Sequence, residues 1–394
     1  MSCSSYADAV KHEFFGIRGT ESSVEGVGKP EGRDRIRGIC RGEEMVAEFI
    51  ATDDPRWADV LIRLEHDVYD LPRYIEMCSE YEHAKPAAFY SCEGDCYCLI
   101  PLLLRRLPCH LGAPSEWCDA SSPYGYSSAL FCGDALWYGK AMEAFTKTCR
   151  ANNIISVFIR LNPLIDFPAD ETAVPGERTL HGRTVGVDLT LSEEEIRKQA
   201  RQNHRVNISR LRREKFTTTV DDWSRYSQFI KVYDETMDRL NADSYYRFGV
   251  RYFERLKEAL NEKLHLLSVI SPDGQMAAGK LLTEVNGIVQ YHLGGTATQY
   301  RGLAPAKLAV DAAIWWAKER GNRILHLGGG VGGREDELFR FKQGFSERTF
   351  QFETWRIVTD SVKYAQVARA GAWATSDSPS FFPSYRAGNL NGVL

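Results

Sequence analysis

The residues whose types and spacing could do chemistry gather between positions 291 and 345. This stretch reads as a strand, a loop, an amphipathic helix, a second strand, a glycine-rich turn and a short helix. Free N–H groups at a helix N-terminus attract phosphate or a developing oxyanion, because the helix dipole adds to their hydrogen-bonding capacity. Two backbone-rich turns of this kind occur here, and the layout indicates acyl transfer.

The first turn precedes a helix that we expect to begin near Ala304, because Pro305 suits the first helical position, where its missing N–H would have no partner. Gln299, Arg301, Gly302 and Ala304 fit the pattern Q/R-x-x-G-x-G/A. They resemble the pyrophosphate loop of GNAT acyltransferases, which makes them candidates for binding the phosphate of a donor. An ordinary helix N-terminus with a glycine in its turn explains the same residues.

The second turn carries a weak dinucleotide-binding pattern. Gly328, Gly330 and Gly333 fit G-x-G-x-x-G after the apolar strand expected at 324–327. That fingerprint normally opens a long helix, whereas the segment 335–345 is short and is followed by a strand-like segment at 348–358. A dinucleotide site is therefore the minor alternative.

The length predicts two domains, and the net charge predicts that the surface is not positively charged as a whole. The chain has 394 residues, of which 43% are hydrophobic, and its net charge is -4. It contains no apolar run of about 18 residues and no export signal, so we expect a soluble, cytoplasmic protein. All ten cysteines fall between Cys3 and Cys149, and in that setting we expect reduced thiols. The spacing of Cys92 and Cys96 predicts that they face each other across a hairpin turn, and we expect no metal site there.

The order of elements suggests a duplicated α+β unit. We expect a poorly ordered leader at 1–42, a first domain at 43–183, a second domain at 184–372 and a tail at 373–394. Ser192 and Glu195 predict a capping box before a helix. Strands at 264–270, 276–285 and 288–293 are expected to join through turns at Asp273-Gly274 and Asn286-Gly287.

Four motifs together resemble the Fem/MurM family. They are SPYGY at 122–126, the strand and helix entry at 187–216, YHLGGT at 291–296 and LGGGVGGREDELFRFKQGFS at 327–346. The resemblance runs from about residue 45 to 370. It implies an α+β fold of two GNAT-like (acyl-CoA N-acyltransferase) domains in tandem, with mixed, mostly antiparallel sheets flanked by helices. It also implies an aminoacyl-tRNA-dependent peptidyltransferase that builds peptidoglycan cross-bridges, with aminoacyl-tRNA as co-substrate and no cofactor.

The chain departs from the family in lacking a long helical arm and in keeping the Q-x-x-G-x-A loop. That loop favours acyl-CoA as an alternative donor, used by an N-acyltransferase acting on a small amine. A catalytically idle binding protein on the same fold is a third possibility.

The family's F-K-x-x-F motif matches Phe341, Lys342 and Phe345. The resemblance implies that Lys342 stabilises the oxyanion formed when an amine attacks the acyl ester, and that Phe341 shapes the pocket. Neighbouring strand residues face opposite sides, so only one of Tyr291 and His292 can enter a cleft. The resemblance favours Tyr291, as a hydrogen-bond donor to substrate, and no carboxylate stands out as a base.

Acceptor and tRNA contacts are expected from three segments. Arg247, Arg251 and Tyr252 lie within about a helical turn and could bind phosphate or carboxylate. Tyr124 and Tyr126 belong to an aromatic loop that we expect to line the shared cleft. A basic run, expected on one helix, could follow an RNA backbone, and a solvated helix face is the equal alternative. Its members are Arg197, Lys198, Arg201, Arg205, Arg210, Arg212, Arg213 and Lys215.

Overall fold

The computed structural model describes residues 44–166, 175–371 and 381–387. The expected leader at 1–42 lies outside the described residues, as does most of the expected tail. All described residues belong to one unit of the chain, which begins at Cys40.

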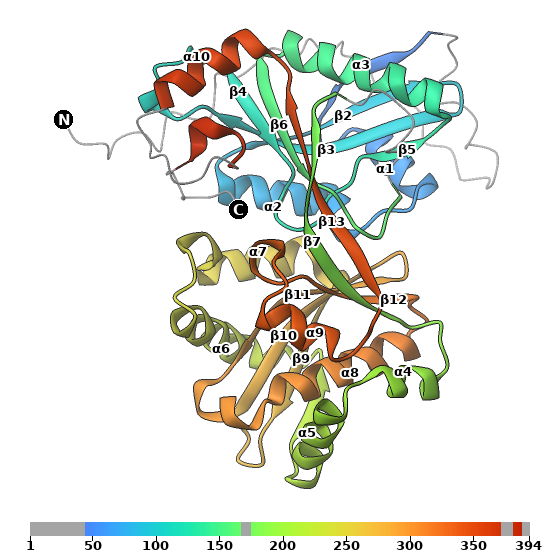
Figure 1. The fold of residues 1–394 in the computed structure, drawn as a ribbon, viewed down its shortest axis with the longest axis vertical. Coiled ribbons are helices and arrows are strands. Elements are labelled where there is room, and N and C mark those ends of the chain that lie inside the picture. The colour runs from blue at the N-terminus through green and yellow to red at the C-terminus, as the bar shows by residue number, and fades with distance from the viewer. Residues whose placement is uncertain (1–43, 167–174, 372–380, 388–394) are drawn as a thin grey trace, which may run out of the picture. The chain divides into compact units, whose positions relative to one another are not determined.

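A mixed sheet flanked by helices forms the framework (Figure 1). Its strands run in the order β1-β2-β3-β4-β6-β13-β7-β12-β11-β10-β9-β8, and β5 pairs with β3 at the side. Most neighbouring strands are antiparallel, while β4 with β6 and β11 with β12 are parallel. This arrangement confirms the expected mixed, mostly antiparallel α+β class.

The first half follows the predicted order of helices, hairpin, long helix and strand. Helix α1 begins at Pro55 behind Asp54, whose side chain accepts a hydrogen bond from the backbone N–H of Arg56 at 3.0 Å. The elements are β1 (Val46–Ile50), α1 (Pro55–Arg63), α2 (Pro72–Glu82), β2 (Lys85–Glu93), β3 (Cys96–Arg106), β4 (Cys118–Ser121), β5 (Leu130–Cys132), α3 (Ala135–Ala151) and β6 (Ile154–Arg160).

The second half confirms the predicted capping box and both predicted hairpin turns. Ser192 and Glu195 cap α4 reciprocally, and Asn286 and Gly287 join two antiparallel strands. The elements are β7 (Glu177–Asp188), α4 (Glu193–Gln199), α5 (Gln202–Arg213), β8 (Thr217–Val220), α6 (Tyr226–Arg239), α7 (Val250–Leu260), β9 (Leu264–Ile270), β10 (Met276–Val285), β11 (Ile288–Thr296), α8 (Pro305–Glu319), β12 (Ile324–Gly328), α9 (Glu337–Gln343), β13 (Thr349–Val358) and α10 (Ser361–Gly371).

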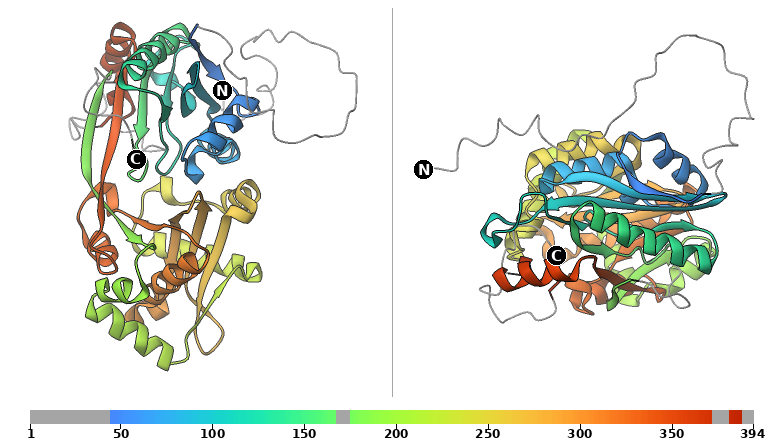
Figure 2. Two further views of the ribbon diagram at one scale, coloured as in Figure 1. Left: turned by 90° about the vertical axis from the view of Figure 1, so that its right-hand side faces the viewer. Right: turned by 90° about the horizontal axis from the view of Figure 1, so that it is seen from above.

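Strands β7 and β13 join the two halves. They pair side by side along their length, β7 also pairs with β12, and β13 also pairs with β6 of the first half (Figure 2). The domain boundary expected between Arg183 and Thr184 therefore falls inside β7. After β13 the chain returns to the first half, where Val367 of α10 packs with Leu111 and Ile155.

One hydrophobic core continues across both halves. Trp57, Tyr69 and Tyr74 of the first half belong to the same buried cluster as Phe229 and Phe253 of the second. A second cluster lies between the sheet and helices α5, α8 and α9. Because burial of this apolar surface supplies most of the folding free energy, the halves stabilise each other.

Three sequence expectations are wrong in detail. The basic run lies on two helices, α4 and α5, which are separated at Ala200 and Arg201. The hairpin register pairs Cys92 with Tyr97 rather than with Cys96. Cys92 is also disulfide-bonded, so the expectation of reduced thiols fails there, while Cys78, Cys96, Cys98, Cys109, Cys118, Cys132 and Cys149 are free.

Within the described ranges, none of the helices is both long enough and apolar enough to pass through a membrane.

Candidate functional site

A bulge in β11 aims neighbouring side chains at different parts of the molecule. Leu281 of β10 faces Leu293, and the next residue, Leu282, faces Tyr291. His292 is therefore the extra residue on β11, without a partner on β10. A bulge bends the strand and redirects its side chains, which is common beside binding sites.

Strands β11 and β12 separate at the same level. Their parallel ladder covers 288–290 of β11 and 324–326 of β12, and it ends at the pair of Gln290 and His326. The remaining edge of β11 has backbone groups that β12 does not use. An extended ligand could add to such an edge, in the way that a peptide adds to a sheet.

Lys342 lies beside this opening. Asp336 is the N-cap of α9, and its carboxylate accepts hydrogen bonds from the N–H groups of Phe339 and Val331, each at 2.9 Å. The Lys342 side chain is only 8% exposed, and its Nζ donates to the carbonyl of Gly329 at 2.6 Å. Burial lowers the pKa of Lys342 to about 8, against the opposing pull of Asp336.

Tyr126 reaches the same turn from the first half. Burial raises the pKa of Tyr126 to about 12, and a hydrogen bond from the backbone of Gly329 acts in the opposite direction. The backbone of Gly329 therefore interacts with Tyr126 through its N–H and with Lys342 through its carbonyl. Residues of the two halves of the chain meet at Gly329.

Gly328 leaves the space that Tyr126 and Lys342 occupy. A Cβ atom at Gly328 would lie 3.2 Å from Tyr126 Oη and 3.4 Å from Lys342 Nζ, and the backbone φ of +75° favours glycine.

We expect Gly328→Ala to lower turnover at least tenfold and to cost about 1 kcal/mol of stability, through backbone strain and displacement of both groups. Steady-state rates and melting curves test this. Gly321→Ala is the matched control, because Gly321 has a φ of +79° and nothing within 4 Å of the added atom.

Tyr291 faces the side of the sheet that α8 and α9 cover. Its ring packs with the apolar cluster under these helices, and Lys280 Nζ lies 4.6 Å from the ring centroid. Its Oη is buried, and no hydrogen-bond partner for it exists among the described residues. An unpaired buried hydroxyl costs free energy, so this atom is available to a ligand.

On the other face, a chain of buried polar groups crosses between the halves. Gln290 donates through Nε2 to Asp67 Oδ2 at 2.5 Å, and Asn162 donates to the same oxygen at 2.9 Å. The Gln290 amide oxygen therefore faces His326 Nδ1, at 2.7 Å, and must accept its proton. This leaves His326 Nε2 as a buried acceptor with no partner in the described chain, and burial, followed by the charge of Lys342, lowers the pKa of His326 to about 3.

His292 completes an aromatic cluster with residues of the first half. Its ring centroid lies 5.9 Å from that of Tyr69, 6.1 Å from Tyr74 and 5.7 Å from Tyr124. Tyr69 Oη is 3.3 Å from His292 Nδ1, and burial lowers the pKa of His292 to about 4. The aromatic loop, α2 and β11 therefore meet at His292, which stays neutral, whereas Tyr291, the residue expected to enter the cleft, packs on the opposite side of the sheet.

With this geometry in place, the matches to known proteins identify the fold. Residues 193–343 match the family model described as an acetyltransferase (GNAT) domain. FemX aligns with a TM-score of 0.61 and 13% identity, over 81% of this chain and 99% of FemX. The chain has a Fem-like tandem GNAT fold. The GNAT domain marks this Fem-like chain as an acyltransferase.

Two further structures share the Fem-like fold. L-PGS from Bacillus licheniformis aligns with a TM-score of 0.52 and 13% identity, over 81% of this chain and 96% of its own. The C-terminal domain of a putative lysylphosphatidylglycerol synthetase from Agrobacterium fabrum aligns with a TM-score of 0.50 and 15% identity, over 81% of this chain and 95% of its own. No curated protein matches the sequence. The resemblance of the sequence motifs and the fold thus agree on a Fem-like tandem GNAT architecture.

The GNAT donor loop lies at the surface before α8. Gln299, Arg301 and Gly302 are exposed on a 3-10 turn (Thr298–Leu303), and Ala304 adopts a left-handed conformation as the N-cap of α8. Among the described residues, no side chain caps this helix; Pro305 has no N–H to offer, and the N–H of Lys307 donates to the Ala304 carbonyl at 3.0 Å. Helix α8 begins at Pro305, as predicted.

The basic helix α5 runs beside α8. Asn207 bonds Lys307 at 2.8 Å and Arg212 pairs with Asp311 at 2.6 Å, so the two helices run in the same direction. The exposed Arg205, on the first turns of α5, therefore lies level with the donor loop.

Four members of the basic run form ion pairs: Arg197 with Glu193, Lys198 with Glu194, Arg210 with Glu214, and Arg212 with Asp311. Arg205, Arg213 and Lys215 make no ion pair with any described residue.

The expected acceptor residues are separated by the fold. Arg247 pairs with Asp238 before α7, and Arg251 is exposed on the first turn of α7. Tyr252 stacks on Phe248 with ring centroids 4.0 Å apart, inside the core shared by both halves. Tyr124, in contrast, borders His292. The structure thus brings together Tyr124, Tyr126 and Lys342 near the strand opening, with Tyr291 on its other face, but not the two arginines.

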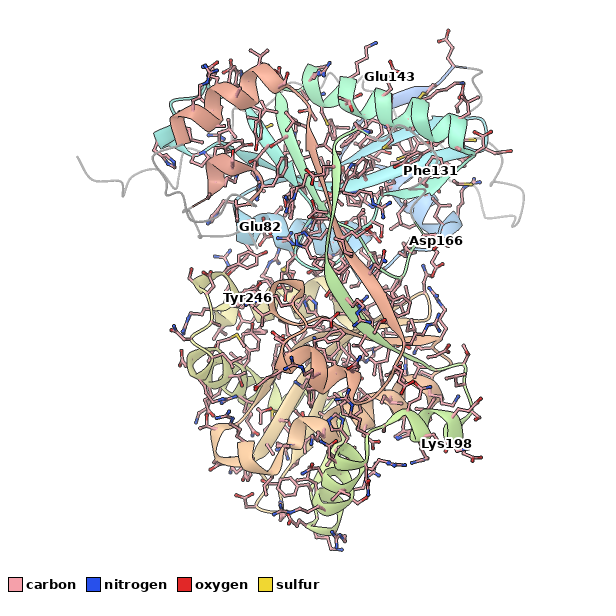
Figure 3. The ribbon with its side chains drawn as sticks, viewed as in Figure 1. Glu82, Phe131, Glu143, Asp166, Lys198 and Tyr246 are labelled. Atoms are coloured by element: carbon pink, nitrogen blue, oxygen red, sulfur yellow. The ribbon has the colours of Figure 1, made fainter. Side chains whose placement is uncertain are left out.

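Figure 3 labels Glu82 on α2 and Tyr246 on the facing part of the second half. Between these elements, Tyr245 Oη lies 3.5 Å from Glu82 Oε1. Burial raises the pKa of Glu82. This hydrogen bond joins the two halves of the chain beside α7.

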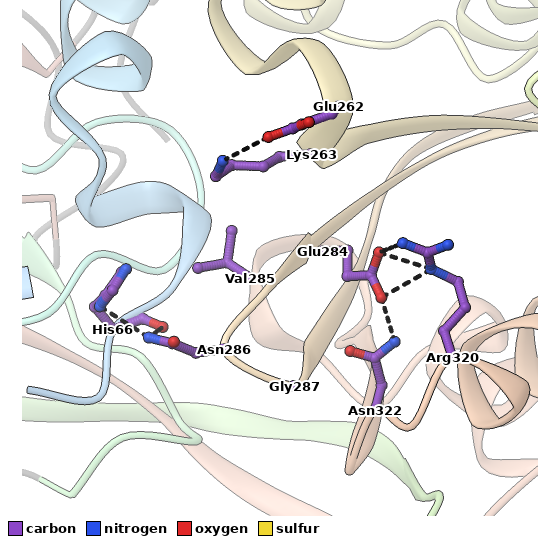
Figure 4. Close-up of a pocket in the computed structure, with 9 residues that line it drawn as sticks. All are labelled: His66, Glu262, Lys263, Glu284, Val285, Asn286, Gly287, Arg320 and Asn322. Atoms are coloured by element: carbon purple, nitrogen blue, oxygen red, sulfur yellow. Dashed lines mark hydrogen bonds and ion pairs between the residues drawn. The ribbon is translucent and has the colours of Figure 1, made fainter. Parts of the chain in front are cut away.

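A separate pocket of about 490 Å³ lies at the turn between β10 and β11 (Figure 4). Its polar groups are already paired: Glu284 accepts from Arg320 and Asn322, and His66 contacts Asn286 at 2.8 Å. It contains none of the expected site residues. We therefore place the chemistry at the strand opening, where polar atoms lack partners.

Sequence reasoning missed Lys280, His326, Gln290 and Asp67. The signal for Lys280 was present, since a single lysine interrupts the apolar strand Met276–Val285. The polar chain through Asp67 had no local signal, because its members are far apart in sequence. In the described part of the chain, no group of His, Cys, Asp and Glu could hold a metal ion.

Proposed function

We propose that the protein transfers an aminoacyl group from aminoacyl-tRNA to an amine, forming an amide bond in peptidoglycan-bridge or related peptide synthesis. The observation that carries this proposal is the position of Lys342. The lysine of the F-K-x-x-F motif is buried at the strand opening and binds the carbonyl of Gly329, whose N–H interacts with Tyr126 of the other half. The resemblance to Fem/MurM proteins is the reason for proposing aminoacyl-tRNA as the donor.

The arrangement suits aminolysis of an ester. Attack by an amine places negative charge on the carbonyl oxygen, and a fixed cation in a water-poor site stabilises that charge. Lys342, with a pKa of about 8, is mostly protonated at neutral pH. Tyr291 Oη is a second donor without a partner in the described chain, on the face covered by α8 and α9.

Label transfer tests the proposal. The purified protein is incubated with a radiolabelled pool of aminoacyl-tRNA or with labelled acetyl-CoA, together with candidate amines. We expect amine-dependent discharge of aminoacyl-tRNA and appearance of label in an amide. Transfer from acetyl-CoA alone would replace the proposal with acyl-CoA chemistry, and transfer from neither donor would indicate a binding protein.

Acyl-CoA-dependent N-acylation of a small amine is the second candidate, favoured by the exposed donor loop at the start of α8. If it holds, Gly302→Glu should abolish acetyl-CoA binding, because a carboxylate repels the pyrophosphate at the helix N-terminus. Gly302 has nothing within 4 Å of an added Cβ atom, so the variant should fold normally. Calorimetric titration with acetyl-CoA measures the loss, with Gly302→Gln as the uncharged control. A wild type that never binds acetyl-CoA rules this candidate out.

A further inference from the structure

Lys280 is a buried lysine at the centre of β10. Its side chain is 7% exposed, and the strand around it is almost entirely apolar. It extends across its cross-strand partner Gly294, where a Cβ atom would overlap Lys280 Cδ and lie 2.5 Å from Nζ. Only glycine leaves this path open, so β11 is shaped to let the lysine reach Tyr291.

The surroundings of Lys280 contain no compensating acid. Its Nζ makes no hydrogen bond or ion pair with any described residue and rests over the Tyr291 ring. From α9, the group that acts on it is the Lys342 cation, while Asp336 on that helix is held by backbone N–H groups and acts on Lys342. Its partner on β9 is Leu267, and α8, which packs on β10, adds apolar side chains such as Leu308 and Ala309 to the cluster on this face. An unpaired buried lysine is costly, which indicates a functional reason for its presence.

The two lysines at this site differ in protonation. Burial, followed by repulsion from Lys342, lowers the pKa of Lys280 to about 7. Lys342 donates to the Gly329 carbonyl and keeps its proton up to about pH 8. At neutral pH, therefore, a large fraction of Lys280 amines carry a free lone pair while Lys342 remains cationic. His326, whose pKa burial and Lys342 lower to about 3, is too weak a base to compete.

We propose that Lys280 is the general base of the acyl transfer. The inference rests on the proposed function and adds the residue that receives the proton. The Lys280 amine takes one proton from the acceptor ammonium, and the freed nitrogen lone pair forms the C–N bond with the ester carbonyl. The tetrahedral intermediate collapses with cleavage of the ester C–O bond, and the leaving ribose oxygen takes its proton from the Lys280 ammonium. The amide nitrogen keeps one proton, and the third is released to water.

This role differs from that of a second anion-binding cation, and arginine separates the two. Arginine preserves a positive charge but stays protonated at all working pH values. A charge-based role would therefore survive Lys280→Arg, whereas a base would not. Methionine removes both properties and fits an apolar strand.

The first experiment compares wild type, Lys280→Met and Lys280→Arg, with an alkylamine or hydroxylamine as acceptor and aminoacyl-tRNA as donor. An alkylamine is protonated at neutral pH and needs a base, whereas hydroxylamine is already neutral. With the alkylamine we expect the wild-type rate to rise with pH through about 7, and both variants to lose about a hundredfold or more at pH 7. With hydroxylamine, the variants should recover part of the lost rate, because the acceptor no longer needs a base while the leaving oxygen still needs a proton. With the alkylamine, a Lys280→Arg variant that remains active overturns the role of Lys280. A Lys280→Met variant whose rate still rises with pH through about 7 also overturns it.

A second measurement does not depend on activity. In protein labelled with ¹³C at the lysine ε-carbons, the resonance that disappears in Lys280→Met should titrate near pH 7. A resonance that remains charged up to pH 9 overturns the base role even if the variants are inactive. If the wild type transfers label from neither donor to either amine, the proposed function fails. If the wild type is active and Lys280→Arg is equally active, only the inference about Lys280 fails.

Discussion

Lys342→Met is expected to lower turnover on the order of a hundredfold while the protein stays folded. In the role that we propose for Lys342, the substitution removes the cation that would stabilise the oxyanion. It also replaces a buried side chain by an apolar one of similar length. Single-turnover rates with aminoacyl-tRNA measure the effect on the chemical step. Melting curves show whether loss of the hydrogen bond to the Gly329 carbonyl disturbs the fold.

The pH dependence of turnover provides a second test of the role of Lys342. The pKa of Lys342 is lowered to about 8, so the active cation is present below pH 8 and is lost as pH rises through that value. Wild-type turnover should therefore fall on the alkaline side, and Lys342→Arg should shift that limb upward because arginine keeps its proton. Arg340 lies on the same helix but is exposed, so Arg340→Met is the matched control and should leave the rate unchanged. Unchanged turnover in Lys342→Met with a normal melting curve would exclude the oxyanion role.

Reversing Arg205 and Arg213 to glutamate is expected to raise the Michaelis constant for aminoacyl-tRNA at least tenfold and to flatten its salt dependence. Each contact to a phosphate releases condensed counterions, so loss of two contacts should reduce the logarithmic salt slope by about 1.5 to 2. Arg205 and Arg213 are preferable to Arg212, because Arg212 is committed to Asp311 and its reversal would disturb the packing of α5 on α8. Filter binding across a range of salt concentrations measures the slope.

Two controls accompany this experiment. A double reversal of Arg197 and Lys198 on α4 changes the net charge equally, but both residues are paired with glutamates on their own helix. It should have a smaller effect, and a small model ester as donor should react at the wild-type rate with either protein. Equal affinity and an equal slope in the Arg205 and Arg213 variant would mean that α5 is a solvated face.

The sequence alone determined the elements and their class. Local signals were sufficient wherever the physics is local: Pro305 set the start of α8, Ser192 and Glu195 set the cap of α4, and Asn286 set a hairpin turn. The order of elements predicted a duplicated α+β unit, the family resemblance of the motifs implied the tandem GNAT fold, and the motif around Lys342 indicated one side of the proposed site. Separate domains were the natural expectation from length, but the continuous passage of β7 and the return of β13 depend on pairings between distant segments.

The chemistry of the site was decided by tertiary structure. A lysine in a strand is normally expected to be exposed, and only tertiary packing, with α8 over β10, buries Lys280 and lowers its pKa to about 7. The tautomer of His326 likewise follows from Asp67, which lies in the other half and fixes the orientation of Gln290. Burial and hydrogen-bond direction depend on which distant segments meet, whereas propensity and capping depend on neighbours along the chain. That difference explains why the sequence predicted the framework and the fold decided which groups hold, lose or accept a proton.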